Sequence, residues 1–378
     1  MSEEELLRKL ISVDSRFPGE KKIGVFIEGF LKRHGFTTKR DYVGKDRFNI
    51  LAEKGSGSKS ILFYGHMDTV PLYGKWKSNP FSLKTVGDRL YGLGAHDMKG
   101  GVAAILESTK DTQTHVKLMF CVDEENISEG AWSVVQKHAH WFDDVKVAIA
   151  AEAGVTEEND GGIDVLTLGR RGRCVITIEV VGLSSHGAEP ERGLSALDQA
   201  AKIAINIERV PLIKHKKLGK ESIFVRSIKS SSTSLSVPDS ACLDLDMHLV
   251  PPNTSLKVKR NIERYIKDLI KSGIINSHTK TRVYIQKRKT PYLEPYATSE
   301  DNKMTKKIVS LAHELSGKDV TFSYGLSVAD ENVLAHILKV PVITIGPRGG
   351  PEHTENEWVS KKSLEEVVSL FKDMLAKL

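Results

Sequence analysis

The chain has 378 residues, 40% of them hydrophobic and 28% charged, with a net charge of +6. A chain of this length is too long to form one compact core, so we expect two domains. The composition is that of an ordinary globular protein and excludes a disordered or fibrous one. The densest basic stretches, 214–220 and 286–289, carry no interleaved aromatic residues, so we expect no nucleic-acid partner and no membrane partner.

The chain begins with MSEEELLRKL, an acidic amphipathic helix start without the basic flank and apolar core of a signal peptide. No apolar run approaches membrane-spanning length. The cysteines Cys121, Cys174 and Cys242 lie far apart in apolar or alternating stretches, which predicts buried free thiols. We therefore expect a soluble, cytoplasmic protein.

Four apolar, β-branched runs each lead into residues that can bind a metal. Continuous apolar runs are typical of strands buried on both faces, and the helical segments 100–110 and 305–317 lie between them. Ligands in open α/β sheets bind just beyond the carboxyl ends of strands, so these residues should meet at one edge. The runs are SILFY before Gly65-His66, VKLMFCV before Asp123-Glu124-Glu125, VKVAIAA before Glu152, and VPVITI shortly before Glu352-His353.

Residues 173–289 follow a different pattern, with elements in the order β-α-β-β-α-β that is typical of ferredoxin-like domains. Residues 243–249 alternate between apolar and polar, as in an antiparallel sheet with one wet face. The predicted fold is therefore an α/β catalytic domain with a mostly parallel central sheet, formed by residues 1–172 and 290–378. A ferredoxin-like α+β domain, residues 173–289, is inserted into it.

Five of the strand-end and turn residues have the chemistry of metal ligands. Zinc sites use imidazole nitrogen and carboxylate oxygen, and Asp97 lies in a glycine-rich turn, GLGAHDMKGG, that opens a helix. Five ligands suit two ions when Asp97 bridges both, and two such ions can activate a shared water. The candidate ligands are His66, Asp97, Glu125, Glu152 and His353.

Two further acidic residues have predicted roles beside the ions. Asp68 is too close in sequence to His66 for an independent ligand, so we expect it to accept a hydrogen bond from the other imidazole nitrogen. If Glu125 binds metal, its neighbour Glu124 can face the water as general base.

Each of these features has a plainer interpretation when it is taken alone. The His66–Asp68 pattern can be structural, the Glu124–Glu125 pair can be a solvated turn, and Glu152 can be a cap or a salt-bridge partner. Their shared position after strands or a glycine-rich turn favours the metal site.

The motifs resemble those of the dinuclear-zinc amidohydrolase and exopeptidase family, over nearly the whole chain. That family includes acetylornithine deacetylase, succinyl-diaminopimelate desuccinylase, aminoacylase and glutamate carboxypeptidase. The resemblance rests on five segments in order: GHMDTVP at 65–71, W-x-x-x-P-F at 76–81, GDRLYGLGAHDMKGG at 87–101, DEEN at 123–126 and EHTENEWV at 352–359.

The resemblance implies two divalent ions, with zinc expected first and cobalt or manganese as alternatives. It implies that His66, Asp97 and Glu152 bind one ion, and that Asp97, Glu125 and His353 bind the other. It also implies Glu124 as general acid and base, and a cis peptide bond between Asp97 and Met98.

The inserted domain resembles the family's lid and dimerisation domain, because GLSSHGAEPERGLSAL at 182–197 resembles a motif found there. This implies a homodimer in which His186 reaches a neighbouring active site and stabilises the oxyanion. On the residues alone, His186 can equally be a loop histidine.

The sequence departs from the family pattern where an acidic substrate would be bound. Leu235 stands where the family commonly has Asn, and His248 stands where it usually has Arg. Candidate substrate contacts are Arg348, with a surface loop charge as its alternative, and Asn332 beside Asp330.

The resemblance implies metal-dependent hydrolysis of the amide bond of an N-acyl amino acid, of the acetylornithine deacetylase or succinyl-diaminopimelate desuccinylase type. A dipeptidase or carboxypeptidase acting on a short peptide is the alternative. A catalytically silent metal-binding relative would be marked by loss of Glu124 or of a ligand, and neither is missing.

Overall fold

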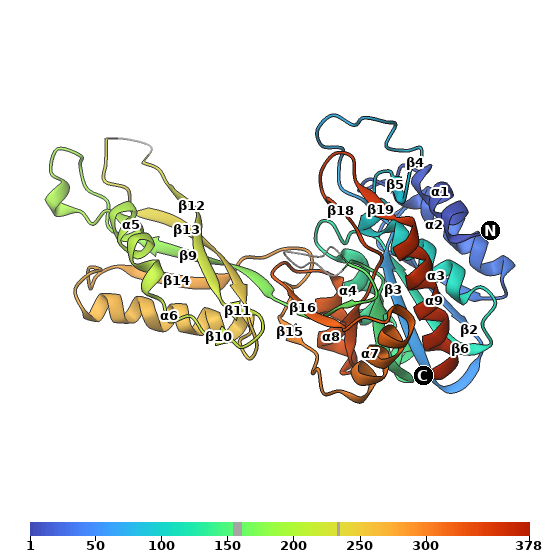
Figure 1. The fold of residues 1–378 in the computed structure, drawn as a ribbon. Helices are drawn as coiled ribbons and strands as arrows, with labels where there is room; N and C mark the ends of the chain where they lie inside the picture. Colours follow the sequence, from blue (N-terminus) through green and yellow to red (C-terminus); the bar gives the residue numbers. More distant parts are fainter. Residues whose placement is uncertain (154–160, 233–234) are drawn as a thin grey trace. The chain divides into compact units, whose positions relative to one another are not determined.

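The structure is a computed structural model that describes residues 1–153, 161–232 and 235–378 (Figure 1). The chain forms two compact units. The first comprises Met1–Gly169, Ala297–Gly325 and Ala329–Leu378, and the second comprises Arg170–Tyr296 and Leu326–Val328. Within the described ranges, no helix is both long enough and apolar enough to cross a membrane.

The first unit is built on a long sheet with a parallel centre. Its strands are β1 (Thr37–Tyr42), β2 (Phe48–Lys54), β3 (Ser56–His66), β6 (Thr114–Cys121), β7 (Val145–Ala150), β8 (Val165–Arg170), β15 (Tyr296–Ala297), β16 (Thr321–Gly325) and β17 (Val342–Thr344). They lie in the order β1-β2-β6-β3-β7-β17-β8-β15, with β16 beside β8. The strands β6, β3, β7 and β17 are parallel, and the pairs toward β1 and β8 are antiparallel. The predicted α/β class with a mostly parallel central sheet is confirmed.

Helices cover this sheet and explain the continuous apolar strands. The helices are α1 (Glu3–Ile11), α2 (Lys21–Arg33), α3 (Gly100–Thr109), α4 (Glu129–Lys137), α7 (Lys303–Ser316), α8 (Asp330–Leu338) and α9 (Lys361–Lys377). Helix α3 packs against α1 and α9, and α4 packs against α8. Every residue of β3 from Ser60 to His66 is buried, as a strand covered on both faces requires.

A small antiparallel sheet brings two distant segments together next to the start of α3. Its strands are β4 (Lys84–Val86), β5 (Arg89–Tyr91), β18 (Gly349–Gly350) and β19 (Trp358–Ser360), in the order β18-β19-β5-β4. Because β19 pairs with β5, residues 352–357 approach the turn that follows β5. That turn continues into a short helical segment, η1 (Ala95–Lys99), and then into α3.

The second unit is an antiparallel sheet with helices. Its main strands are β9 (Gly172–Val181), β12 (Ser222–Ser230), β13 (Ser240–Leu249) and β14 (Lys280–Ile285), in the order β12-β13-β9-β14. The helices are α5 (Ala196–Asn206) and α6 (Ser255–Lys271), and β10 (Lys214–His215) pairs with β11 (Gly219–Lys220). The apolar side of β13, including Leu243, Leu245 and Met247, belongs to the core. The opposite side is less wet than its alternation predicts, because Asp246 is only 2% exposed.

Candidate metal centre

His66 ends the buried strand β3 and faces the carboxylate of Asp97. Its Nδ1 lies 3.0 Å from the backbone oxygen of Asp68, and its Nε2 lies 2.9 Å from Oδ1 of Asp97. A carbonyl oxygen can only accept, so Nδ1 carries the proton and Nε2 presents a lone pair to the carboxylate unless the ring is cationic. Burial acts to lower the pKa of His66, yet the hydrogen bond and charge of Asp97 raise it well above its usual value. A bound cation would supply the positive charge that Asp97 otherwise draws from a protonated His66.

His353 faces the other oxygen of the same carboxylate. Its Nε2 lies 3.1 Å from Oδ2 of Asp97 and 3.0 Å from Oε2 of Glu125. The hydrogen bonds to Asp97 and Glu125 raise the pKa of His353 to about 11. Asp97 therefore lies between two imidazoles, with one oxygen directed to each.

Glu125 and Glu124 follow β6 and have raised pKa values. Burial, together with the charge of Asp97, raises the pKa of Glu125 to about 7. Burial also raises the pKa of Glu124 well above its usual value, and the negative charges of Glu152 and Glu125 act in the same direction. Glu152 itself follows β7, close enough to Glu124 for their charges to interact.

Asp68 supports the glutamate pair through its carboxylate. Its oxygens accept hydrogen bonds from the backbone N–H groups of Glu124, at 3.3 Å, and Glu125, at 3.0 Å. We expected the carboxylate to accept from His66, but its Oδ1 is 3.8 Å from Nδ1, and the backbone oxygen of Asp68 makes that contact instead. One residue thus orients the His66 ring through its main chain and the glutamate loop through its side chain.

The loop that carries Glu124 and Glu125 is also held from β2 and from the segment before it. Asn49 accepts the N–H of Val122 at 3.1 Å and donates to the oxygen of Gly130 at 3.0 Å. Arg47 contacts Oδ1 of Asp123 at 3.1 Å. Sequence reasoning missed both residues, because a contact between positions more than 70 residues apart leaves no local pattern.

The turn that carries Asp97 has an acceptor that sequence reasoning also missed. Glu357 accepts hydrogen bonds from the backbone N–H groups of Gly94, His96 and Asp97. Gly94 has a φ of 76°, and a Cβ there would lie 2.6 Å from the side chain of Thr69, so the turn requires glycine. The peptide bond between Asp97 and Met98 is cis, which confirms that expectation.

The candidate substrate contacts in the first unit are already engaged. Arg348 donates to Oδ1 of Asp164 at 2.9 Å. Asn332 is buried, and its Oδ1 accepts the N–H of Ala329 at the start of α8. Asp330 is fully buried and accepts the hydroxyl of Tyr64 at 2.7 Å. None of these contacts directs its group toward Asp97.

The two histidines singled out in the second unit differ in exposure. His186 is exposed, and its Nδ1 accepts the N–H of Ala188 at 3.1 Å, which leaves Nε2 as the protonated nitrogen. His248 is half-buried, and burial lowers its pKa. On the neighbouring strand β9, Arg173 lies opposite His248 in the register.

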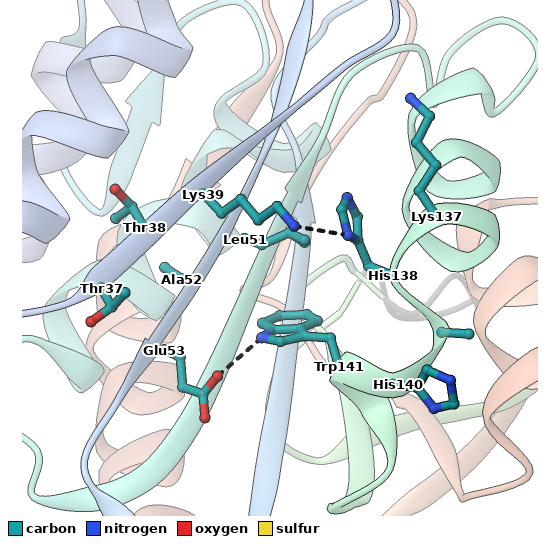
Figure 2. Close-up of a pocket in the computed structure, with 11 residues that line it drawn as sticks. Thr37, Thr38, Lys39, Leu51, Ala52, Glu53, Lys137, His138, His140 and Trp141 are labelled. Carbon is teal, nitrogen blue, oxygen red and sulfur yellow. Dashed lines mark hydrogen bonds between the residues drawn. The ribbon is translucent and has the colours of Figure 1, made fainter.

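A separate cavity of about 440 Å³ in the first unit contains none of the predicted ligands (Figure 2). Lys39 Nζ lies 3.3 Å from Nδ1 of His138, and Trp141 donates to Glu53 at 3.0 Å. These polar groups already pair with one another, so the cavity does not compete with the Asp97 cluster as the functional site.

The Asp97 cluster has the composition that divalent ions require. Single ligand atoms of His66, Asp97 and Glu125 lie within 4.8 Å of one another. Oε1 of Glu125 is buried and has no hydrogen-bond partner among residues 1–153, 161–232 and 235–378. No lysine or arginine in those ranges forms an ion pair with Asp97 or Glu125. Imidazole nitrogens and carboxylate oxygens are the donors that zinc and related ions accept, so the residues fit the group.

The match with known families covers most of the chain. The model of peptidase family M20/M25/M40 matches residues 62–377. The chain belongs to this family. It resembles the succinyl-diaminopimelate desuccinylase of Sulfurimonas denitrificans, with 26% identity, over 98% of each chain. It resembles carboxypeptidase G2 of a Pseudomonas species with 31% identity, over 64% of this chain and 58% of the relative.

A solved structure shares the fold. A Bacillus subtilis protein described as a dinuclear metal binding peptidase from the M20 family superposes with a TM-score of 0.73 and 15% identity, covering 99% of this chain and 96% of that one. Peptidases and desuccinylases are hydrolases, and the chain is accordingly a hydrolase of the M20 family. The family resemblance read from the sequence motifs is confirmed.

Proposed function

We propose that this M20 protein holds two divalent ions, preferably zinc, with cobalt or manganese as alternatives. In this proposal His66, Asp97 and Glu152 bind one ion, and Asp97, Glu125 and His353 bind the other. The single observation that carries it is the placement of Asp97, whose two oxygens face Nε2 of His66 at 2.9 Å and Nε2 of His353 at 3.1 Å. A carboxylate between two imidazoles is well placed to bridge two cations.

When bound, such a pair of ions polarises a carbonyl and makes a water nucleophilic near neutral pH. Glu124 takes the proton of the attacking water and later delivers a proton to the leaving amine nitrogen. Burial raises the pKa of Glu124, and two nearby cations would lower it, so that the carboxylate could accept a proton and then donate it. Asp68 keeps Glu124 and Glu125 in place through their backbone N–H groups.

The proposed reaction is hydrolysis of the amide bond of an N-acyl amino acid, of the acetylornithine deacetylase or succinyl-diaminopimelate desuccinylase type. The full-length similarity to a desuccinylase supports this choice. The similarity to carboxypeptidase G2 supports the second candidate, a carboxypeptidase or dipeptidase acting on short peptides at the same centre.

We propose that the second unit, with its β-α-β-β-α-β order, acts as a ferredoxin-like lid and dimerisation domain. In the homodimer, His186 would serve the active site of the other subunit by donating a hydrogen bond to the oxyanion. Its exposure and its Nδ1 contact support this, because they leave Nε2–H free to donate to a ligand. The three free cysteines support a cytoplasmic location.

The test is hydrolysis of a matched panel of N-acetyl amino acids, N-succinyl amino acids and dipeptides by zinc- or cobalt-loaded protein. We expect activity toward acyl amino acids, its loss with a chelator, and its return when metal is added. Activity toward dipeptides alone would select the second candidate. Protein that binds no metal, or whose hydrolysis survives complete removal of metal, would overturn the proposal.

A further inference from the structure

The short segment η1, which carries Asp97, has non-helical backbone dihedral angles at Asp97 and Met98. Its first N–H groups have no acceptor on a neighbouring side chain in the described part of the chain. Buried backbone N–H groups need an acceptor, and where a chain enters a helical turn a nearby Ser, Thr, Asp or Asn usually provides it. The residue before η1 is Gly94, which has no side chain to offer. The capping acceptor comes instead from 263 positions further along the chain.

Glu357 supplies that acceptor with both carboxylate oxygens. Its Oε2 accepts the N–H of Gly94 at 2.7 Å, and its Oε1 accepts those of His96 at 2.7 Å and Asp97 at 2.9 Å. The side chain is only 2% exposed, so it cannot contact a substrate. Burial raises the pKa of Glu357 to about 8, whereas the three N–H donors act in the opposite direction because they favour the ionised carboxylate. All three contacts are donors to its oxygens, so the geometry suits a carboxylate that only accepts.

The same residue is fixed to the segment that carries His353. Glu357 lies directly before β19, and the pairing of β19 with β5 holds Glu357 next to the turn that follows β5. Its backbone oxygen also accepts the N–H of Gly92 at 3.1 Å. Four residues earlier in the chain, His353 contacts Oδ2 of Asp97. Glu357 therefore ties together the two segments that provide Asp97 and His353.

We propose that Glu357 is a positioning residue that aims the carboxylate of Asp97 at both ion positions and keeps His353 in reach of it. This inference rests on the proposed metal centre and adds to it a residue that neither binds an ion nor takes part in the chemistry. Partners of this kind, which orient a ligand without binding the metal, typically contribute about 10–100-fold to metal affinity.

The decisive variant is Glu357→Gln, which keeps the shape and removes one acceptor. A glutamine oxygen can still accept two N–H groups, but its NH₂ group must then face the third N–H, donor against donor. We expect the affinity for zinc, measured by competition with a chelator, to fall about 10–100-fold. We also expect the visible absorption spectrum of the cobalt-loaded protein to change, since the ligand directions change.

Glu221→Gln is the matched control. Glu221 is a buried glutamate of the second unit that accepts the N–H of Ile213 at 3.1 Å and the side-chain amide of Asn253 at 2.8 Å. We expect both variants to lose thermal stability. Glu221→Gln should nevertheless leave the zinc affinity and the cobalt spectrum unchanged. If Glu357→Gln fails to fold, Glu357→Asp is the alternative, because it keeps the charge on a shorter side chain that lies farther from the N–H groups. It should show a smaller fall in zinc affinity and a smaller change in the cobalt spectrum.

Two outcomes would overturn the inference, and they can be told apart. If wild-type protein binds zinc but the folded Glu357 variants match its affinity and spectrum, Glu357 has only a structural role and the metal centre stands. If wild-type protein itself binds neither zinc nor cobalt, both the metal centre and the positioning role fail.

Discussion

Each unit of the molecule buries a cluster of acids, and the two clusters are compensated differently. In the second unit, Asp246 accepts from Nε of Arg173 at 3.0 Å and from its Nη2 at 2.6 Å. Its neighbour Asp244 accepts hydroxyl groups of Thr177 and Ser227. In the first unit, Asp97 and Glu125 have only imidazoles as their basic partners among the residues that the structure describes.

The difference in basic partners distinguishes acids with a structural role from acids that can bind a ligand. Asp246 meets a guanidinium that satisfies both oxygens, so its burial is compensated within the fold. Glu125 meets no guanidinium in the described ranges, and burial raises its pKa to about 7. A strongly perturbed acid in a cluster is a mark of a functional site. The contrast can be tested by removing one group at a time from each cluster.

The largest effect should follow Glu124→Gln in the first unit. The amide keeps the size of the side chain but cannot take a proton from water, so we expect kcat to fall about 10²–10⁴-fold. Metal content should stay at the wild-type level, as measured by elemental analysis of the same samples. Glu107→Gln, a buried glutamate of the same unit that pairs with Lys110, should leave kcat unchanged. Normal hydrolysis by Glu124→Gln would refute the general-base role.

The next largest effect should follow Arg173→Met in the second unit. Asp246 would keep only the more distant guanidinium of Arg226, whose Nη1 lies 3.8 Å from its Oδ2. We expect a loss of about 2–4 kcal/mol in the free energy of unfolding, below the full cost of breaking a buried pair, because Arg226 remains and Arg173 is 39% exposed. Urea denaturation measures this loss. The double variant Arg173→Met/Asp246→Leu should recover most of it. Equal stability of the single variant and wild type would show that Asp246 does not need Arg173 for compensation.

The contrast also shows what the sequence could predict. His66 and Glu125 were predicted because each follows a continuous apolar strand, and parallel strands deliver their ends to one edge. The structure brings these residues together with Asp97 and His353. Local order along the chain was enough for this part of the site.

The supporting residues could not be predicted in the same way. Glu357, Arg47 and Asn49 act across 73 to 263 positions in sequence. Glu357 and Asn49 accept backbone N–H groups, which every residue type except proline has, and Arg47 contacts the side chain of Asp123. Asp246 was assigned to a wet face by alternation, but its burial depends on Arg173 of a neighbouring strand. Strand pairing is a tertiary property, so alternation gives the face of a residue but not its exposure.

Asp330 tests whether an acid with a raised pKa must be a metal ligand. The expected effect of its substitution, on stability, is smaller than the two above. Burial raises its pKa to about 7, above the ordinary 3.8, and it accepts the hydroxyl of Tyr64. A raised folded-state pKa stabilises the protein at low pH and loses this contribution as pH rises through about 7. Asp330→Asn should therefore gain stability relative to wild type between about pH 5 and about pH 8, by on the order of 1–3 kcal/mol.

Urea unfolding of metal-free protein across this pH range measures the Asp330 effect. The informative quantity is the change of the difference with pH, because a constant offset reflects only the packing of Asn. Zinc content should stay close to the wild-type level, since Asp330 accepts the hydroxyl of Tyr64 and acts on His66 and Glu124 only through its charge. A difference that stays flat with pH would mean that Asp330 has an ordinary pKa.

The smallest effect should follow Arg348→Met. Its guanidinium donates to Asp164 at 2.9 Å, and the pair is partly exposed, so we expect a loss of less than about 1 kcal/mol in stability. Because the charge is already engaged, the Michaelis constant for acyl amino acids should change less than about 3-fold, which corresponds to less than about 1 kcal/mol. If that constant instead rises tenfold or more at unchanged stability, Arg348 leaves Asp164 to bind the substrate. Asp164→Asn separates the two cases, because freeing an Arg348 that binds substrate would lower the Michaelis constant, whereas a purely structural pair would leave it unchanged.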